Sequence, residues 1–260
     1  MIQRIKKDKL EVKIYSTRAE LGQAAGYEAG NQIKELLNSQ QIINIIFAAA
    51  PSQNEFLESL INQQGIAWDR INAFHMDEYL GLPADAPQGF GNFLRERIFK
   101  HRPFRSVSYL NGQCGSIESE CNRYSQLLSL HPTDIVCMGI GENGHIAFND
   151  PHVADFDDPS QVKVVELDAL CRQQQVNDGC FSAIGQVPTH ALTLTIPALL
   201  KAPYIFCMVP GINKAQAVAN TLEKEISALY PSTILRNHPS AILYIDTQSA
   251  LQIKSDKVAK

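Results

Sequence analysis

One segment of the sequence concentrates side chains that could transfer protons. It reads GIGENGHIAFNDP (139–151) and places His145 between Asn143 and Asp150. A histidine whose tautomer is fixed by polar neighbours can act as a general acid or base near neutral pH. A lone histidine beside an apolar segment is more often a core residue bonded to the backbone. Here the flanking Asn143 and Asp150 favour the acid–base interpretation.

A second segment, MDEYLGL (76–82), carries the adjacent carboxylates Asp77 and Glu78. In one interpretation Asp77 caps a turn and Glu78 is solvated, because aspartate is a common turn former. In the other, Asp77 is a general base placed where a carbon atom of a bound substrate can reach it. The segment by itself leaves both interpretations open.

Two further loops are suited to binding an anion. AAAPSQ (48–53) and VPGINK (209–214) each lead from an apolar run into a predicted helix. The free N–H groups and the positive dipole end of a helix N-terminus favour anions. Lys214 adds a positive charge at the start of the second of these helices. These features predict a phosphorylated small molecule as the ligand.

The four loops follow strands in a chain that alternates between strands and helices. Continuous apolar runs predict buried strands, and apolar residues at helical spacing predict the helices between them. The predicted strands cover 12–15, 43–50, 71–76, 134–140, 162–167, 191–196, 204–209 and 241–246, and the predicted helices cover 17–37, 56–60, 93–98, 118–130 and 212–224. This order predicts one α/β domain (1–260) with a doubly wound, mostly parallel sheet and helices on both faces. Ligands bind such sheets at the carboxyl ends of strands, so we expect the four loops to converge.

The glycines Gly139, Gly141 and Gly144 also fit the GxGxxG pattern of dinucleotide-binding loops. That pattern should follow the first strand and open a long helix, with an acidic residue about 20 residues later. Here it lies mid-chain and His145 follows at once. We therefore favour the other interpretation, in which these glycines permit positive φ and a close approach of the backbone to a ligand.

Composition and charge exclude several classes of partner. The net charge of −4 gives no electrostatic reason to bind nucleic acid or an anionic membrane. The 6 cysteines form no CxxC pair, which predicts reduced thiols. No segment approaches the roughly 20 apolar residues of a membrane span. The sequence predicts a cytoplasmic protein with a small-molecule ligand, and it leaves open whether the chain forms a homo-oligomer.

The segments FHMDEYLGL and GIGENGHIAFNDP together resemble the glucosamine-6-phosphate deaminase (isomerase) family, and the order of motifs resembles that family along nearly the whole chain. The related 6-phosphogluconolactonases typically have an arginine after the Asp-Glu pair and a GHTASLFP-like sequence after the histidine. This chain has Tyr79 at the first position and 146–149 reads IAFN. The resemblance implies a Rossmann-like fold and conversion of glucosamine 6-phosphate to fructose 6-phosphate and ammonia, without a metal or organic cofactor.

The resemblance also implies roles for individual residues. His145, oriented by Asn143 and Asp150, would open the sugar ring, and Asp77 would move a proton from C2 to C1. The remaining implied residues bind the substrate, its phosphate above all: Ser52, Gln53, Gly144, Lys214 and Arg172, the last in a lid segment.

The chain departs from the family pattern in the phosphate loop and beside the histidine. AAAPSQ replaces a turn rich in glycine and threonine, and Pro51 has no N–H to donate to a phosphate. Asn143 and Asp150 stand where the glucosamine enzymes commonly have Asp and Glu. Asparagine at the first position also occurs in relatives that act on galactosamine 6-phosphate, which makes deamination of that epimer the alternative function.

Three other functions are compatible with parts of the sequence. A sugar-phosphate sensor that binds without turnover would account for the altered phosphate loop, and a 6-phosphogluconolactonase would share the fold. A metal-dependent hydrolase could be assembled from five scattered side chains, but no HxxxH or HxH spacing supports it. Those side chains are His75, Asp77, His145, Asp150 and His152.

Overall fold

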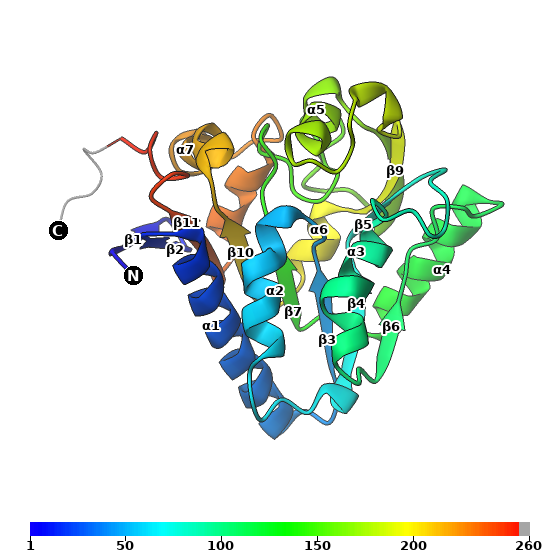
Figure 1. Cartoon of the computed structure of the whole chain (residues 1–260), viewed down its shortest axis with the longest axis horizontal. Coiled ribbons are helices and arrows are strands. Elements are labelled where there is room, and N and C mark those ends of the chain that lie inside the picture. The colour runs from blue at the N-terminus through cyan, green and yellow to red at the C-terminus, as the bar shows by residue number, and fades with distance from the viewer. Residues whose placement is uncertain (255–260) are drawn as a thin grey trace.

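A computed structural model describes residues 1–254 (Figure 1). Its larger sheet has eight strands in the order β1-β2-β11-β10-β7-β3-β4-β6. All neighbours are parallel except the β1–β2 hairpin, which confirms the predicted fold class. The strands are β1 (Gln3–Lys7), β2 (Leu10–Tyr15), β3 (Ile43–Phe47), β4 (Ile71–His75), β6 (Ser106–Ser108), β7 (Ile135–Met138), β10 (Tyr204–Val209) and β11 (Ala241–Asp246). The predicted domain, 1–260, includes residues 255–260, which lie outside this description.

Helices cover both faces of the larger sheet because successive side chains of a strand point to opposite faces. In β3, Ile45 and Phe47 belong to one apolar cluster and Ile46 to the other. The first cluster includes α1 (Arg18–Ser39), α2 (Asn54–Ile61) and α3 (Phe90–Arg97), and the second includes α4 (Ile117–Leu130), α6 (Ile196–Leu200) and α7 (Ala215–Glu223). Short 3₁₀ helices join these elements: η1 (Pro51–Gln53), η2 (Trp68–Arg70), η3 (Phe99–His101), η4 (Ile184–Gln186), η5 (Ile212–Lys214) and η6 (Pro231–Asn237).

The start of α1 follows from its sequence. Thr17 Oγ1 accepts a hydrogen bond from the Glu20 backbone N–H at 3.2 Å, which is the first contact of a capping box. The Glu20 carboxylate accepts a hydrogen bond from the backbone N–H of Ser16, at 3.3 Å, rather than from that of Thr17. The cap thus fixes where the chain leaves β2 and where Arg18, the first residue of α1, is placed.

A second sheet of three antiparallel strands corrects one expectation. Two of the strands predicted for the parallel sheet, β8 (Val162–Glu166) and β9 (His190–Leu194), instead pair with each other and with the short β5 (Asp77–Tyr79). In β8, Val162 and Val165 are buried while Val164 and Glu166 are exposed, so this strand is less completely covered than the central strands of the larger sheet. Figure 1 shows α5 (Ala169–Asn177) and β9 above the carboxyl ends of the parallel strands, where they cover the loops of interest. In residues 1–254, no helix is both long and apolar enough to cross a membrane.

Candidate active site

The loops that follow β3, β4, β7 and β10 meet at one cavity of about 60 Å³. Parallel strands present their carboxyl ends at one edge of a sheet, which brings loops that are distant in sequence together. The cavity wall contains one or two predicted site residues from each loop, namely Ser52, Gln53, Asp77, His145 and Lys214. The structure therefore places these five side chains around the same space.

Asp77 is held at this cavity by a short strand and a buried histidine. It pairs with Thr193 of β9. His75 Nε2 lies 2.9 Å from the Leu110 backbone nitrogen, which must donate, so the His75 proton is on Nδ1 and is donated to the Asp77 carbonyl oxygen at 2.9 Å. Burial, and then the charge of Glu78, raise the pKa of the Asp77 carboxyl well above its usual value. A raised pKa suits a base that works near neutral pH.

Glu78 is buried, not solvated as one interpretation of the sequence had it. Its carboxylate accepts hydrogen bonds from the backbone N–H groups of Tyr79, Phe90 and Gly91 at 3.0, 3.0 and 2.9 Å. Burial still raises the pKa of Glu78, against the effect of these three hydrogen bonds. The contacts fix the start of α3 and with it Phe90, which lines the cavity.

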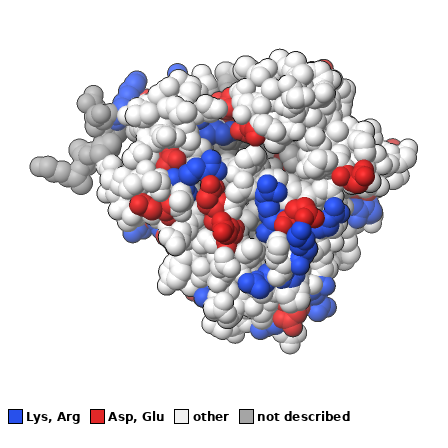
Figure 2. Space-filling model, viewed as in Figure 1, with Lys and Arg blue, Asp and Glu red and all other residues white. Residues whose placement is uncertain are grey.

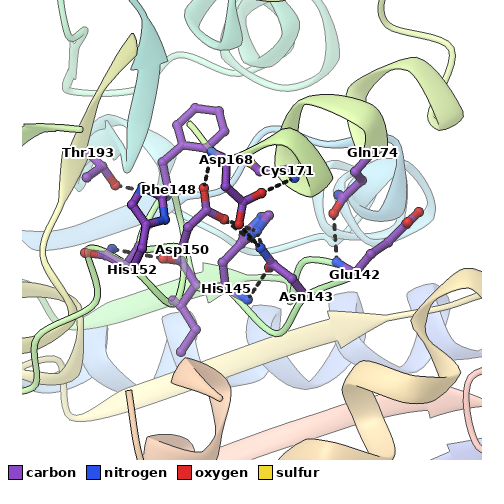
Figure 3. Close-up of polar contacts among 12 residues, drawn as sticks. Glu142, Asn143, His145, Phe148, Asp150, His152, Asp168, Cys171, Gln174 and Thr193 are labelled. Atoms are coloured by element: carbon purple, nitrogen blue, oxygen red, sulfur yellow. Dashed lines mark hydrogen bonds and ion pairs between the residues drawn. The ribbon is translucent and has the colours of Figure 1, made fainter. Parts of the chain in front are cut away.

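His145 lies in a network of polar side chains (Figure 3). Its Nδ1 is 2.8 Å from Asn143 Oδ1 and 3.0 Å from Asp150 Oδ1, both acceptors. Asn143 is oriented by the His145 backbone N–H, which donates to its Oδ1, and its Nδ2 donates to Asp150 and Asp168 at 2.9 and 3.0 Å. The proton of a neutral His145 is therefore on Nδ1. That leaves Nε2 able to accept a proton from a ligand.

Asp150 supplies beside His145 the negative charge that Asn143 lacks. Burial would raise the pKa of Asp150, but hydrogen bonds and charge from His145, together with Asn143 and the Asp168 N–H, lower it. Asp150 is one methylene shorter than the glutamate common at this position in the family. Its direct contact with His145 shows that the loop lies close enough to compensate for that difference. Sequence reasoning missed Asp168, although an aspartate before a helix is an N-cap signal, and here it accepts from the Cys171 N–H at 2.6 Å.

The glycines of this loop shape the site and do not open a dinucleotide-binding helix. A Cβ atom on Gly141 would lie 2.1 Å from Cε1 and 2.3 Å from Nε2 of His145, so only glycine lets the imidazole pack there. Gly144 has a φ of +87°, and its carbonyl oxygen accepts from the Ser232 N–H at 2.9 Å. Gly144 was predicted to bind substrate, but it is not part of the cavity wall, and its place is in the turn before His145.

Lys214 is a buried cation in the cavity wall, and it lies on η5, after β10. Within residues 1–254 its ammonium group makes no hydrogen bond or ion pair, and the residue is 6% exposed. Burial lowers its pKa, against the charges of Asp178 and Glu142. A bound anion would compensate this buried charge. The adjacent Ser52 Oγ accepts from Gln53 Nε2 at 3.1 Å, which leaves its hydroxyl hydrogen for a ligand.

Arg172 is not brought together with these residues. Its guanidinium donates from Nη2 to the carbonyl oxygens of Ile184 and Val187 at 2.8 and 2.9 Å, and so ties α5 to the loop behind it. The same helix, α5, instead presents Gln174 and Gln175 to the cavity. Sequence reasoning missed both, because they lie in a run of three glutamines that carries no motif.

Metal-ligating side chains also gather next to the cavity. Among the described residues, His145 forms one such group with Asp150 and Cys171, and Asp150 forms another with His152 and Asp168. His75 and Asp77, which the hydrolase hypothesis combined with them, belong to neither group. Both ring nitrogens of His75 are occupied by backbone hydrogen bonds, so that set of five ligands is not assembled.

An acid–base pair and a buried lysine at the carboxyl edge of a mostly parallel sheet are the arrangement expected of α/β proteins that act on a small anionic molecule. The chain belongs to the family of glucosamine-6-phosphate isomerases and 6-phosphogluconolactonases, whose model matches residues 16–244. It is 36% identical over 199 residues to a glucosamine-6-phosphate deaminase of Bacillus cytotoxicus, covering 76% of this chain and 74% of that one. It is 32% identical over 250 residues to a glucosamine-6-phosphate deaminase of Bacillus cereus, covering 96% and 91%.

Solved structures agree with this assignment. A monomeric glucosamine-6-phosphate deaminase of the NagB superfamily superposes with a TM-score of 0.84 at 32% identity, over 93% of this chain and 99% of that chain. A 6-phosphogluconolactonase from Thermotoga maritima has a TM-score of 0.75 at 19% identity, over 92% of this chain and 100% of that chain, and shares the fold.

Proposed function

We propose that this chain deaminates and isomerises an amino-sugar 6-phosphate, with glucosamine 6-phosphate as substrate and fructose 6-phosphate and ammonia as products. The observation that carries the proposal is that Asp77 and His145 line the same cavity as Lys214, whose ammonium group has no partner among residues 1–254. The names of the Bacillus relatives, which match most of the chain, support glucosamine 6-phosphate as the substrate. The cytoplasmic location inferred from the sequence stays a prediction.

The first chemical step is opening of the sugar ring, and His145 is suited to it. Its unprotonated Nε2 accepts the proton of the C1 hydroxyl and returns it to the ring oxygen as the C1–O5 bond breaks. The ionised Asp150, 3.0 Å from Nδ1, stabilises the imidazolium that forms in between. Asn143 keeps the ring in the required orientation through its two hydrogen bonds to His145.

The second step moves a proton between adjacent carbons. Asp77 removes the proton from C2, and the same carboxyl delivers it to C1. O1 gains a proton and the amine loses one, so the aldehyde becomes a C1 hydroxyl and the amine becomes a C2 imine. One water then adds to C2 and ammonia leaves, so the net reaction consumes one water for each ammonia and the C–N cleavage is hydrolytic. Lys214 and Ser52 hold the phosphate meanwhile, and orientation of this kind contributes much of the rate.

The test is to incubate the protein with glucosamine 6-phosphate and, separately, with galactosamine 6-phosphate, and to measure ammonia and ketose phosphate. Galactosamine 6-phosphate is the second candidate because of Asn143 beside His145. Faster turnover of galactosamine 6-phosphate would make that compound the substrate in place of glucosamine 6-phosphate. Binding of a sugar phosphate without ammonia release would indicate a sensor, and hydrolysis of 6-phosphogluconolactone would indicate a lactonase.

A further inference from the structure

A second cavity adjoins the first on the side of Lys214. It measures about 220 Å³ and shares Ser52 and Lys214 with the cavity that contains Asp77 and His145. The start of α1, the η1 turn and the loop 210–214 form its wall. Figure 2 shows basic and acidic side chains together on this face, in the hollow between α5, α7 and the upper end of α2.

The sizes of the two cavities indicate how a ligand is placed. The first cavity, at about 60 Å³, is far below the roughly 300 Å³ or more of typical small-molecule sites. A hexose phosphate whose C1 and C2 lie at Asp77 and His145 must therefore extend past Ser52 and Lys214. Its phosphate then lies at the junction, with oxygen atoms exposed to the second cavity.

Arg18 lines this second cavity. Its Nε and Nη2 bond the two carboxylate oxygens of Glu55 at 2.7 and 2.9 Å, and Nη2 also donates to the Pro51 carbonyl oxygen at 3.0 Å. These contacts fix the guanidinium against the altered phosphate loop. Within residues 1–254, its Nη1 makes no hydrogen bond, so one edge of the guanidinium is free to donate.

We propose that Arg18 is the second cation of the phosphate site and, with Lys214, takes the place that the resemblance gave to Arg172. A phosphate dianion needs more than the single buried charge of Lys214. Asp178 also lines the second cavity, where its carboxylate accepts from Gln174 Nε2 at 3.3 Å. Among the side chains that line this cavity, the positive charges of Arg18 and Lys214 outnumber the negative charge of Asp178, while Glu55 pairs with Arg18 from outside the lining. The proposal rests on the proposed function only for the identity of the phosphorylated ligand.

The test measures binding directly, by isothermal titration with fructose 6-phosphate, inorganic phosphate and unphosphorylated fructose. Arg18→Gln is expected to weaken binding of the two phosphate ligands about 5- to 10-fold, a modest factor because the Arg18 side chain is 46% exposed. Arg18→Lys, which keeps the charge, should recover part of this loss. Binding of fructose should not change.

Two matched controls separate ligand binding from local structure. Glu55→Gln breaks the same ion pair but keeps the cation, so it should bind phosphate at least as tightly as the wild type. Arg4→Gln removes an arginine from another exposed arginine–glutamate pair, with Glu11, and should have no effect. Unchanged phosphate affinity in Arg18→Gln, or equal loss in Glu55→Gln, would overturn the proposal.

The binding measurement does not require turnover. If the wild type binds fructose 6-phosphate through Arg18 but releases no ammonia from either amino sugar, the proposed function fails and the role of Arg18 stands. If the wild type turns over glucosamine 6-phosphate and Arg18→Gln shows the same KM and phosphate affinity, the role of Arg18 fails alone.

Discussion

The imidazole of His145 lies 3.0 Å from the carboxylate of Asp150, Nδ1 to Oδ1, in a contact that is almost closed to solvent. The same Nδ1 lies 2.8 Å from the amide oxygen of Asn143. Two acceptors at Nδ1 hold the proton there in the neutral ring, and the carboxylate stabilises the protonated ring. The pair therefore makes Nε2 the atom that exchanges protons with a ligand.

Replacing Asp150 by asparagine is expected to lower kcat at least about 100-fold, with a much smaller change in KM, because the amide cannot stabilise an imidazolium. Steady-state kinetics with the amino-sugar phosphate measure this. Asp157→Asn, at an exposed position on the same loop, is the matched control. Wild-type kcat in Asp150→Asn would show that the charge has no part in the reaction.

Gly141→Ala tests the position of the imidazole without removing any polar group. The new Cβ would lie 2.1 Å from Cε1 of His145, so the ring must turn away. Displacement of a catalytic group by about 1 Å can cost roughly 100-fold, and we expect a loss of that order in kcat/KM with the fold retained. Gly115→Ala is the control, since within residues 1–254 no atom beyond its chain neighbours lies within 4 Å of a Cβ there. Normal kinetics in Gly141→Ala would contradict the assigned packing.

The parallel sheet could be predicted because its central strands are buried on both faces, so that segments such as 43–47 read as continuous apolar runs. The second sheet could not, because β5 has only three residues and is too short to show a period. The pairing partner of a strand is also not a local property of its sequence. The charged Lys163 and Glu166 within β8 were the available signal, because strands buried on both faces read as continuous apolar runs.

The convergence of Asp77, His145 and Lys214 could be predicted because each follows a strand of the same sheet directly. Arg172 could not be placed in this way, since its helix belongs to a lid whose packing depends on distant carbonyl groups. The same lid brings Gln175 to the cavity, 7% exposed, from a glutamine run without any recognisable pattern. Arg18 was missed because it lies far from every motif and reaches the site only through the fold.

His75 is expected to make stability depend on pH. Burial lowers its pKa from 6.5 to about 4, so the unfolded chain binds its proton at a higher pH than the folded chain. The stabilisation is fully present above pH 6.5 and is lost as pH falls toward 4, by about 3 kcal/mol over this range. His75→Gln lacks this pH-dependent contribution. The difference in unfolding free energy between wild type and variant should therefore shrink by about 3 kcal/mol from pH 7 to pH 4.

Urea unfolding at a series of pH values measures this difference. His101→Gln, at an exposed histidine, controls for the substitution itself. A difference between wild type and His75→Gln that stays constant from pH 7 to pH 4 would show that His75 is not held neutral by its surroundings.

The pH dependence of the reaction tests Asp77 in its assigned role. A base must be ionised to act, and burial together with the charge of Glu78 raises the pKa of Asp77. Activity is therefore lost as pH falls through that raised pKa, so the acid limb of kcat/KM should lie well above pH 3.8, the usual pKa of an aspartate. Asp77→Asn should fold normally yet abolish exchange of the C2 hydrogen with solvent deuterium, whereas Asp85→Asn, an exposed carboxyl on the following loop, should keep it. Exchange that persists in Asp77→Asn would assign the proton transfer to another group.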